Sequence, residues 1–319
     1  MSDVSENLQR VREQMAQSAE RSGRSADAVT LITVSKTWPA EVVQKVVDVG
    51  ANVLGENRVQ EAEGKVGGVQ GDVSWHLIGH LQRNKVKSAV ELFDVIHSVD
   101  SLRLAREIGK RAVQAGMRAR VLVQVNTSGE GSKFGVEPDE AMDVVGQMAE
   151  MDGLGIEGVM TIGAFEPDPE AVRPEFVQLR ELRDRIAAAY LPGVSMAELS
   201  MGMTNDFEVA IEEGATMVRV GAAILGPGRG RDYDRGIAGH HSICVGGDQY
   251  VADRGGRGGG NPGVFAVDFF CHQSLQHPIV LGPKSDRSSG VANCTNDAGQ
   301  PQCCALVVDS GDADRGLFF

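Results

Sequence analysis

Short apolar runs alternate with helical patterns over residues 31–221, and this alternation restricts the chain to a small set of folds. Eight runs are typical of strands, at 31–35, 52–54, 75–79, 94–99, 120–126, 156–161, 197–201 and 217–221. Seven helical candidates separate them, at 39–49, 56–66, 82–90, 101–115, 138–150, 171–189 and 204–213. Such alternation indicates a parallel sheet with crossover helices. Eight strand–helix units in roughly 230 residues match the size of a single (β/α)8 TIM barrel, an α/β fold.

The first strand and its exit distinguish this barrel from an open, doubly wound sheet. A doubly wound sheet normally has a glycine-rich turn after its first strand, whereas here the strand runs into Ser35-Lys36-Thr37. The sequence therefore favours the barrel. An extra N-terminal helix over 4–22 is expected to precede it, since apolar residues recur there at spacings of three and four: Leu8, Val11, Met15 and Ala19.

Prolines and glycines mark where several helices begin and end. Pro39 and Pro138 stand where the first helical turns are expected. Gly50, Gly116 and Gly214 follow the expected ends of three helices, where a glycine readily adopts the left-handed conformation of a C-terminal cap.

Charge and cysteine content narrow the possible partners and the compartment. The 319 residues include 44 acidic and 31 basic side chains, a net charge of −13, which argues against binding to nucleic acid or to anionic membranes. We find no apolar window long enough for a membrane span, and the polar N-terminus predicts no secretory signal. Residues 1–233 have no cysteine, which predicts a cytoplasmic protein.

The C-terminal stretch differs in composition from the rest of the chain. All five cysteines follow residue 230, while glutamate is absent there and Lys284 is the one lysine. Glycine-rich sequence such as RGGRGGG and the lack of regular periodicity predict low order. We therefore expect a barrel domain over 1–233, followed by a disordered tail over 234–319 with no assigned function.

Polar residues follow the expected strands where a TIM barrel carries its functional site. Lys36 ends an apolar strand face shared with Ile32 and Val34, so desolvation would lower its pKa and make it a candidate Schiff-base nucleophile. The alternative is a lysine that extends to solvent. Arg219 lies within the eighth strand, where a buried guanidinium needs an acceptor, and Glu198 is the alternative, purely structural partner.

The loops after strands seven and eight have the features of a phosphate site. Ser200, Gly202 and Thr204 offer hydroxyls and a close backbone approach, with Thr204 at the expected helix start. Gly221 and Ala222 bring the eighth strand to the same point. Helix capping by serine and threonine is the alternative explanation.

Two histidines are interpreted differently. His76 alternates with apolar neighbours and is expected in the core, whereas His80 follows a strand and is a candidate pocket residue. Motifs typical of metal sites or of hydrolases, such as HExxH, paired CxxC or G-x-S-x-G, do not occur in the sequence of the barrel region.

Several separated motifs together resemble one known family. They are LITVSKT, LGENRVQE, WHLIGHLQRNK, IHSVDS, LVQVNTSGEGSKFGV, GVMTIG, LSMGMTNDFEVAI and VRVGAAILG, from about residue 5 to Tyr233. In this order they resemble the YggS/PROSC pyridoxal-phosphate homeostasis proteins, which are related to the N-terminal barrel of alanine racemase (fold type III).

The resemblance implies a role for each candidate residue. Lys36 would hold pyridoxal 5'-phosphate as a Schiff base, and Arg219 would face the ring nitrogen. The phosphate would contact Ser200, Gly202, Thr204, Gly221 and Ala222, with Asn57 beside the ring and His80 near the pocket. Two positions depart from the family pattern: Arg58 stands where tyrosine is frequent, and Ala222 where threonine is frequent.

The resemblance also implies what the protein does. Such proteins are monomeric cofactor binders that maintain vitamin B6 balance, without established catalytic turnover, and apo forms of pyridoxal-phosphate enzymes are candidate recipients. The alternative is an amino-acid racemase, which would need a second base, a tyrosine, on the opposite face of the substrate carbon. A phosphate-binding barrel acting on a sugar phosphate is a third hypothesis.

Overall fold

The computed structural model describes residues 4–130, 134–226, 290–295 and 301–307. The chain divides into two compact units, Met1–Ile237 and Ala238–Phe319. In the described residues we find no helix that is both long and apolar enough to cross a membrane.

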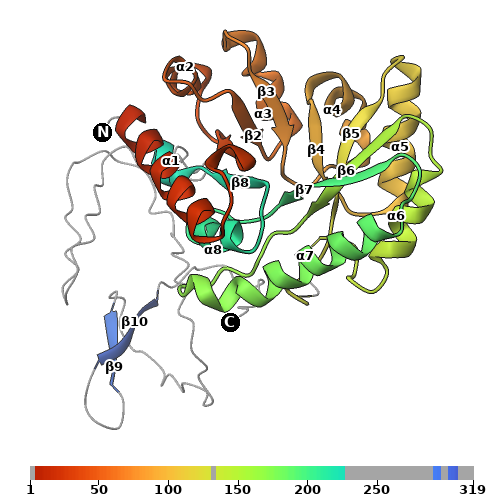
Figure 1. Ribbon diagram of the computed structural model, residues 1–319. Helices are drawn as coiled ribbons and strands as arrows, with labels where there is room; N and C mark the ends of the chain where they lie inside the picture. The colour runs from red at the N-terminus through yellow and green to blue at the C-terminus, as the bar shows by residue number, and fades with distance from the viewer. Residues whose placement is uncertain (1–3, 131–133, 227–289, 296–300, 308–319) are drawn as a thin grey trace, which may run out of the picture. The chain divides into compact units, whose positions relative to one another are not determined.

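Eight parallel strands close into one barrel in the first unit (Figure 1). Neighbours in the barrel follow chain order, and β8 pairs with β1 to close it, with Arg219 opposite Ile32. The α/β barrel expected from the sequence is therefore confirmed. The strands are β1 (Thr30–Val34), β2 (Val53–Glu56), β3 (Ser74–Leu77), β4 (Val95–Val99), β5 (Ala119–Gln124), β6 (Leu154–Met160), β7 (Val194–Ser200) and β8 (Met217–Val220).

Helices surround the barrel and connect successive strands (Figure 1). The α-helices are α1 (Val4–Arg21), α2 (Ala40–Asp48), α3 (Val59–Glu63), α4 (Val86–Leu92), α5 (Leu102–Gln114), α6 (Ala141–Ala149), α7 (Arg173–Ala188), α8 (Phe207–Glu212) and α9 (Ala222–Leu225). Short 3-10 turns are η1 (Ala26–Ala28), η2 (Val66–Gly68), η3 (Arg83–Lys85) and η4 (Pro169–Val172).

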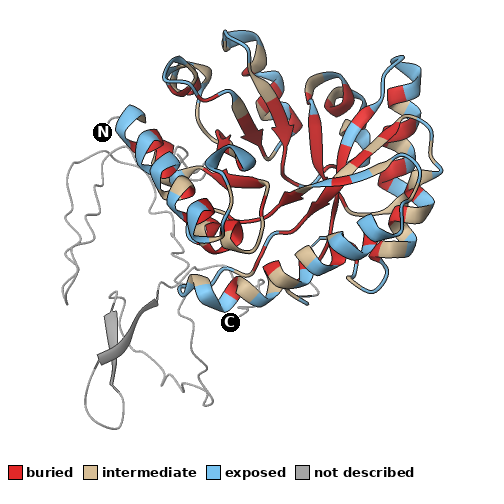
Figure 2. Cartoon of the chain, viewed as in Figure 1, coloured by how far each residue is buried: buried red, intermediate tan, exposed pale blue. Residues whose placement is uncertain are grey.

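The hydrophobic core has two parts. A small cluster fills the inside of the barrel, and a larger one lies between the strands and the helices. Figure 2 shows strands buried along most of their length and helices buried on one side only, as amphipathic patterning requires. The inner cluster consists of Ile32, Val95, Leu122, Met160 and Met217.

The N-terminal helix α1 precedes the first strand and packs against α8 and α9. Its predicted apolar stripe is buried, with exposed fractions of 5% or less for Leu8, Val11, Met15 and Ala19. The Asn7 side chain donates a hydrogen bond to the carbonyl of Ile224 (3.0 Å). The helix therefore covers the elements on either side of β8.

Some helix boundaries predicted from the sequence are wrong. Pro138 precedes the helix, because a turn occupies the residues before α6 and the helix begins at Ala141. The predicted start at Thr204 is also displaced, since the carboxylate of Asp206 accepts a hydrogen bond from the amide of Met203 and this turn delays α8 to Phe207. The glycine caps are confirmed: φ is +97°, +69° and +97° at Gly50, Gly116 and Gly214.

In the second unit the structure describes two strands. β9 (Gly290–Thr295) and β10 (Pro301–Val307) pair antiparallel. The sequence analysis expected no regular element in this region, because alternation of apolar and polar residues is short there. The expectation of disorder for the remainder of 234–319 concerns residues outside those described.

Candidate functional site

Lys36 lies in the turn that follows β1. Thr37 adopts a left-handed conformation (φ +67°), and its amide donates to a carboxylate oxygen of Glu61 (3.0 Å). This turn ends the strand after Ser35 and leaves Lys36 exposed. The expected desolvation of Lys36 at the end of an apolar strand face is therefore wrong, because the strand ends before the lysine. The amine is accessible at the C-terminal end of the barrel.

A buried ion pair between Lys65 and Glu56 stabilises the turn that follows β1. The Lys65 ammonium donates to the carbonyl of Ser35 (2.8 Å) and to the Glu56 carboxylate (2.7 Å). The Ser35 hydroxyl donates to the same Glu56 oxygen (2.6 Å), and Glu56 is fully buried. The residue immediately before Lys36 is thus fixed by a charge pair that the sequence analysis did not identify. The sequence feature that could have revealed this pair is Lys65 itself, a lysine that stands between Gly64 and Val66 just after α3.

Arg219 is buried inside the barrel with 4% of its surface exposed. One guanidinium nitrogen donates to the Ser200 hydroxyl (2.6 Å), and another donates to the Thr161 carbonyl (2.7 Å). Burial lowers the Arg219 pKa to about 10, although the nearby Asp206 carboxylate opposes this fall. The guanidinium therefore remains charged near neutral pH.

The acceptors of Arg219 are neutral, which corrects the alternative proposed from the sequence. Glu198 instead accepts a hydrogen bond from the Thr216 hydroxyl (2.6 Å). With no carboxylate bound directly to it, the Arg219 cation is available to a ligand at the barrel end.

A chain of hydrogen bonds connects Ser200 to a histidine pair in the barrel. The Ser200 hydroxyl lies 3.0 Å from Nδ1 of His97, and Nε2 of His97 lies 2.9 Å from Nδ1 of His76. Nε2 of His76 lies 3.2 Å from the Ser74 hydroxyl, which donates to Asp94 (3.1 Å). Burial lowers the His76 pKa to about 4 and holds the His97 pKa well below 6.5. Both imidazoles are therefore neutral near pH 7.

Only one histidine of this hydrogen-bonded series was predicted from the sequence. The core position predicted for His76 is confirmed, since it is 4% exposed, but His97 was missed. Its signal was its position two residues after Val95 on a fully buried strand.

The candidate phosphate residues lie after β7 and around β8. The Thr204 hydroxyl accepts a hydrogen bond from the amide of Gly221 (3.4 Å), so the two loops meet. Gly202 has φ +89°, and a Cβ there would lie 2.5 Å from the Cβ of Ala210. A Cβ on Gly221 would lie 3.1 Å from Val34, two residues before Lys36. Gly221 and Lys36 are therefore neighbours across the β8–β1 seam, with Ala222 exposed next to them.

Ser200 differs from the other candidate phosphate residues because it is fully buried. Its hydroxyl is already engaged with Arg219 and His97. This geometry assigns Ser200 a contact with the guanidinium.

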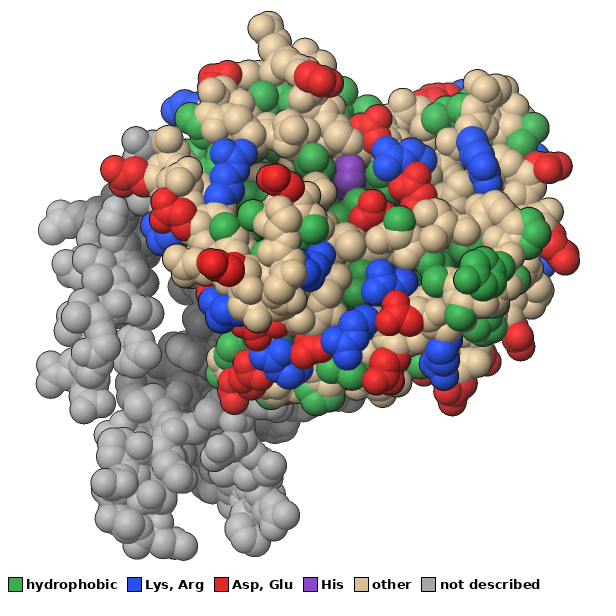
Figure 3. All heavy atoms as spheres, in the orientation of Figure 1, with side chains coloured by type: hydrophobic (Ala, Val, Ile, Leu, Met, Phe, Trp, Pro, Cys, Tyr) green, Lys and Arg blue, Asp and Glu red, His purple; other side chains and the backbone are tan. Residues whose placement is uncertain are grey.

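Asn57 and His80 lie after β2 and β3. The two loops pack closely, because a Cβ on Gly79 would come within 2.3 Å of the Asn57 carbonyl oxygen. Nδ1 of His80 lies 3.1 Å from an Asp100 oxygen, and its ring stacks on Phe134 with centroids 3.8 Å apart. A cavity of about 630 Å³ is lined by this group, including Asn57, Arg58, Gly79 and His80. Figure 3 shows a histidine in a hollow of the surface with charged side chains around it.

Comparison with known proteins identifies the family. Residues 6–228 match the model of the alanine racemase N-terminal domain. The chain is 44% identical over 222 residues to the pyridoxal phosphate homeostasis protein of Aquifex aeolicus, covering 69% of this chain and 96% of the relative. The Escherichia coli protein of that name is 38% identical over 240 residues, with 74% and 100% covered. The chain belongs to the pyridoxal phosphate homeostasis protein family.

Solved structures agree with this assignment. PipY of Synechococcus elongatus, solved with PLP bound, has a TM-score of 0.62 and 33% identity, covering 70% of this chain and all of PipY. Alanine racemase of Clostridium difficile, at 16% identity and a TM-score of 0.56, shares the fold alone. In this homeostasis-family chain, the sequence-predicted residues lie at or after the C-terminal ends of β1, β2, β3, β7 and β8.

The side chains at this end of the barrel suit the cofactor that the family name implies. An accessible primary amine, a buried cation, a threonine hydroxyl and close-approach glycines converge there. The Thr37 hydroxyl, beside Lys36, is buried without a hydrogen-bond partner among the described residues. This donor set fits an anionic aldehyde with an aromatic ring nitrogen.

Proposed function

We propose that this protein binds pyridoxal 5'-phosphate as a Schiff base on Lys36 and serves in cofactor homeostasis rather than in catalysis. The observation that carries the proposal is the arrangement of Lys36, Gly221 and Arg219 at one end of the barrel, in a family whose relatives carry this function in their names. The barrel unit would carry the function, and residues 234–319 would have no assigned part in it.

Each residue has a distinct task in this proposal. Lys36 would hold the cofactor through its amine, and the cofactor would supply an electron-accepting ring when bound. The Arg219 cation disfavours a proton on the ring nitrogen and so limits that electron-accepting capacity. Ser200 fixes the guanidinium through its 2.6 Å hydrogen bond.

The remaining residues orient the ligand. Thr204 and the backbone of Gly202, Gly221 and Ala222 would hold the phosphate. Asn57 would contact the ring, and His80 would border the opening.

The position of Tyr190 does not suit the second base of a racemase. A racemase of this lineage needs a tyrosine base opposite the lysine. Tyr190 is the tyrosine that the described residues contain, and it lies between α7 and β7. That connection leads into the N-terminal end of a strand, so Tyr190 is at the opposite end of the barrel from Lys36. We therefore assign no catalytic residue.

The sequence also supports a proposal for the location and the type of ligand of this protein. The cysteine-free sequence of residues 1–233 supports a cytoplasmic location. The excess of acidic residues supports a small-molecule ligand rather than nucleic acid. We propose that the protein acts as a monomer, with apo forms of pyridoxal-phosphate enzymes as recipients.

Borohydride trapping tests the attachment site. Purified protein incubated with pyridoxal phosphate and reduced should carry one pyridoxyl group on Lys36, as measured by peptide mass spectrometry. Lys36→Arg should lose this group and the visible absorption of the bound cofactor, because a guanidinium does not form the bond while its charge is kept. Lys45→Arg, at an exposed lysine of α2, is the matched control and should retain both. Trapping that persists in Lys36→Arg would refute the assignment.

Turnover is tested with the same preparation. Protein loaded with pyridoxal phosphate and incubated with L-alanine should form D-alanine no faster than free pyridoxal phosphate does. Enzyme-dependent racemisation would favour the racemase hypothesis.

A further inference from the structure

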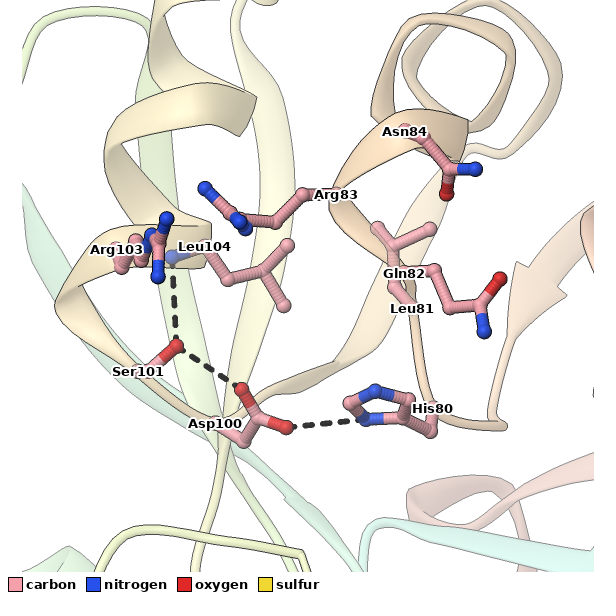
Figure 4. Close-up of a pocket in the computed structure, with 9 residues that line it drawn as sticks. All are labelled: His80, Leu81, Gln82, Arg83, Asn84, Asp100, Ser101, Arg103 and Leu104. Carbon is pink, nitrogen blue, oxygen red and sulfur yellow. Dashed lines mark hydrogen bonds and ion pairs between the residues drawn. The ribbon is translucent and has the colours of Figure 1, made fainter.

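A second recess lies on the other side of His80, between the loop after β3 and the first turn of α5 (Figure 4). Its volume is about 490 Å³, within the range of small-molecule sites. The barrel strands that lead into it are β3 and β4, which lie across the closed barrel from β7 and β8. The recess is therefore separate from the phosphate residues Thr204 and Gly221.

Two arginines give this recess positive charge. Arg83 and Arg103 are exposed, and neither forms a hydrogen bond or ion pair with a described residue. In Figure 4 the Arg83 side chain extends across the recess toward Arg103, and both guanidinium groups lie on the same side of Leu104. Like charges facing each other are unfavourable unless an anion joins them.

The single acidic side chain of the lining does not neutralise these arginines. One oxygen of Asp100 accepts from the Ser101 hydroxyl (3.1 Å), and the other lies 3.1 Å from Nδ1 of His80. Figure 4 shows these two contacts, and no ion pair joins Asp100 to either arginine among the described residues. The recess is thus locally cationic in a chain whose net charge is −13.

The first turn of α5 adds backbone donors to the same recess. The Ser101 hydroxyl accepts from the amide of Leu104 (3.3 Å), which leaves the amides of Leu102 and Arg103 without an acceptor in the described residues. α5 has 13 residues, so its aligned peptide dipoles favour an anion at this end.

Neutral polar side chains complete the lining of the recess. The amide side chains of Gln82 and Asn84 border it opposite the first turn of α5 (Figure 4). Leu81 and Leu104 also line it, but each has only 2% of its surface exposed and presents almost no apolar surface to a ligand. The recess is therefore lined mainly by polar donors.

We propose that this recess binds the phosphomonoester group of a small molecule, with Arg83 and Arg103 on the phosphate. Guanidinium groups favour phosphate oxygens because their planar N–H donors can bind two oxygens at once. The inference goes beyond the proposed function, because it concerns a second anion site with its own residues.

Calorimetric titration of the full chain with phenyl phosphate tests the proposal. The double variant Arg83→Ala/Arg103→Ala should bind at least about tenfold more weakly, since each charge-assisted contact is strong. The matched control Lys87→Ala/Lys110→Ala removes two exposed charges from α4 and α5 outside the lining and should change affinity less than about twofold. Circular dichroism confirms that both variants are folded.

Two further measurements separate this site from the cofactor site. Pyridoxal phosphate trapping on Lys36 should be unchanged in the double arginine variant, and inorganic phosphate should compete with phenyl phosphate in the unaltered chain. Equal affinity of the arginine variant and the unaltered chain for phenyl phosphate would overturn the site, and so would the absence of competition by inorganic phosphate. If phenyl phosphate binding depends on the arginines while Lys36 is not trapped, the inference stands and the proposed function fails.

Discussion

At the scale of single residues, Arg219 shows how this barrel accommodates a buried cation. Burial lowers its pKa to about 10, because desolvation disfavours the charged form. Two neutral acceptors, Ser200 and the Thr161 carbonyl, offset part of this cost. Buried cations are normally paired with a carboxylate, and among the described residues no carboxylate forms a hydrogen bond with Arg219.

His76 makes stability depend on pH. Its folded pKa of about 4 is below the unfolded value near 6.5, so between these values the unfolded chain binds one more proton than the folded chain. Stability therefore falls as pH decreases through this window and is constant above it. Lowering the pH from 7 to 5 should decrease the free energy of unfolding of the unaltered chain. In the His76→Gln variant this decrease should be smaller by about 2 kcal/mol. Urea unfolding at the two pH values measures this difference.

A core variant without a titratable group controls for general destabilisation. Phe93→Leu should lower the free energy of unfolding equally at pH 7 and pH 5. If His76→Gln behaved in the same way, the pH dependence would have to come from other groups.

At the scale of elements, the turn between β1 and α2 depends on residues outside it. Lys65 and Glu56 come from later segments, and their side chains hold the carbonyl and hydroxyl of Ser35. Strand and helix locations followed from periodicity, since apolar runs and helical stripes are local properties of the sequence. The contacts that hold Ser35 could not be predicted from periodicity, because Lys65 and Ser35 are 30 residues apart and meet only when the strands pair.

Lys65→Met should destabilise the protein by about 3–5 kcal/mol, because it leaves the buried Glu56 carboxylate without its cation. The double variant Glu56→Gln/Lys65→Met should cost less than the sum of the two single changes, as measured by denaturant unfolding in a double-mutant cycle. Arg111→Met, which breaks an exposed pair with Glu107, is the control and should cost about 0.5 kcal/mol or less. Additive single effects at Glu56 and Lys65 would contradict the coupling.

At the scale of the whole molecule, the barrel accounts for the full length of its relatives. The chain covers 96% and 100% of two curated relatives while using 69% and 74% of its own length. The change in composition near residue 230 lies close to the boundary between the two units, Met1–Ile237 and Ala238–Phe319. The boundary could be predicted from the sequence because amino-acid composition is a property averaged over many residues. The pairing of β9 with β10 was not foreseen, since apolar and polar residues do not alternate regularly in GVANCT and PQCCALV, which form these strands.

A chain stopped after Ile237 should keep the stability and the cofactor binding of the full chain. The eight strands, both core clusters and every candidate cofactor residue lie before this point, and barrel closure requires only the pairing of β8 with β1. The free energy of unfolding should change by less than about 0.5 kcal/mol, because the barrel keeps all its strands and its core, and borohydride trapping on Lys36 should be complete. A chain stopped after Thr216 is the control: without β8 it loses Arg219, Gly221 and the partner strand of β1, so it should neither unfold cooperatively nor trap the cofactor. A large loss of stability or of trapping in the Ile237 version would show that residues 238–319 complete the site, and it would return weight to a two-domain enzyme.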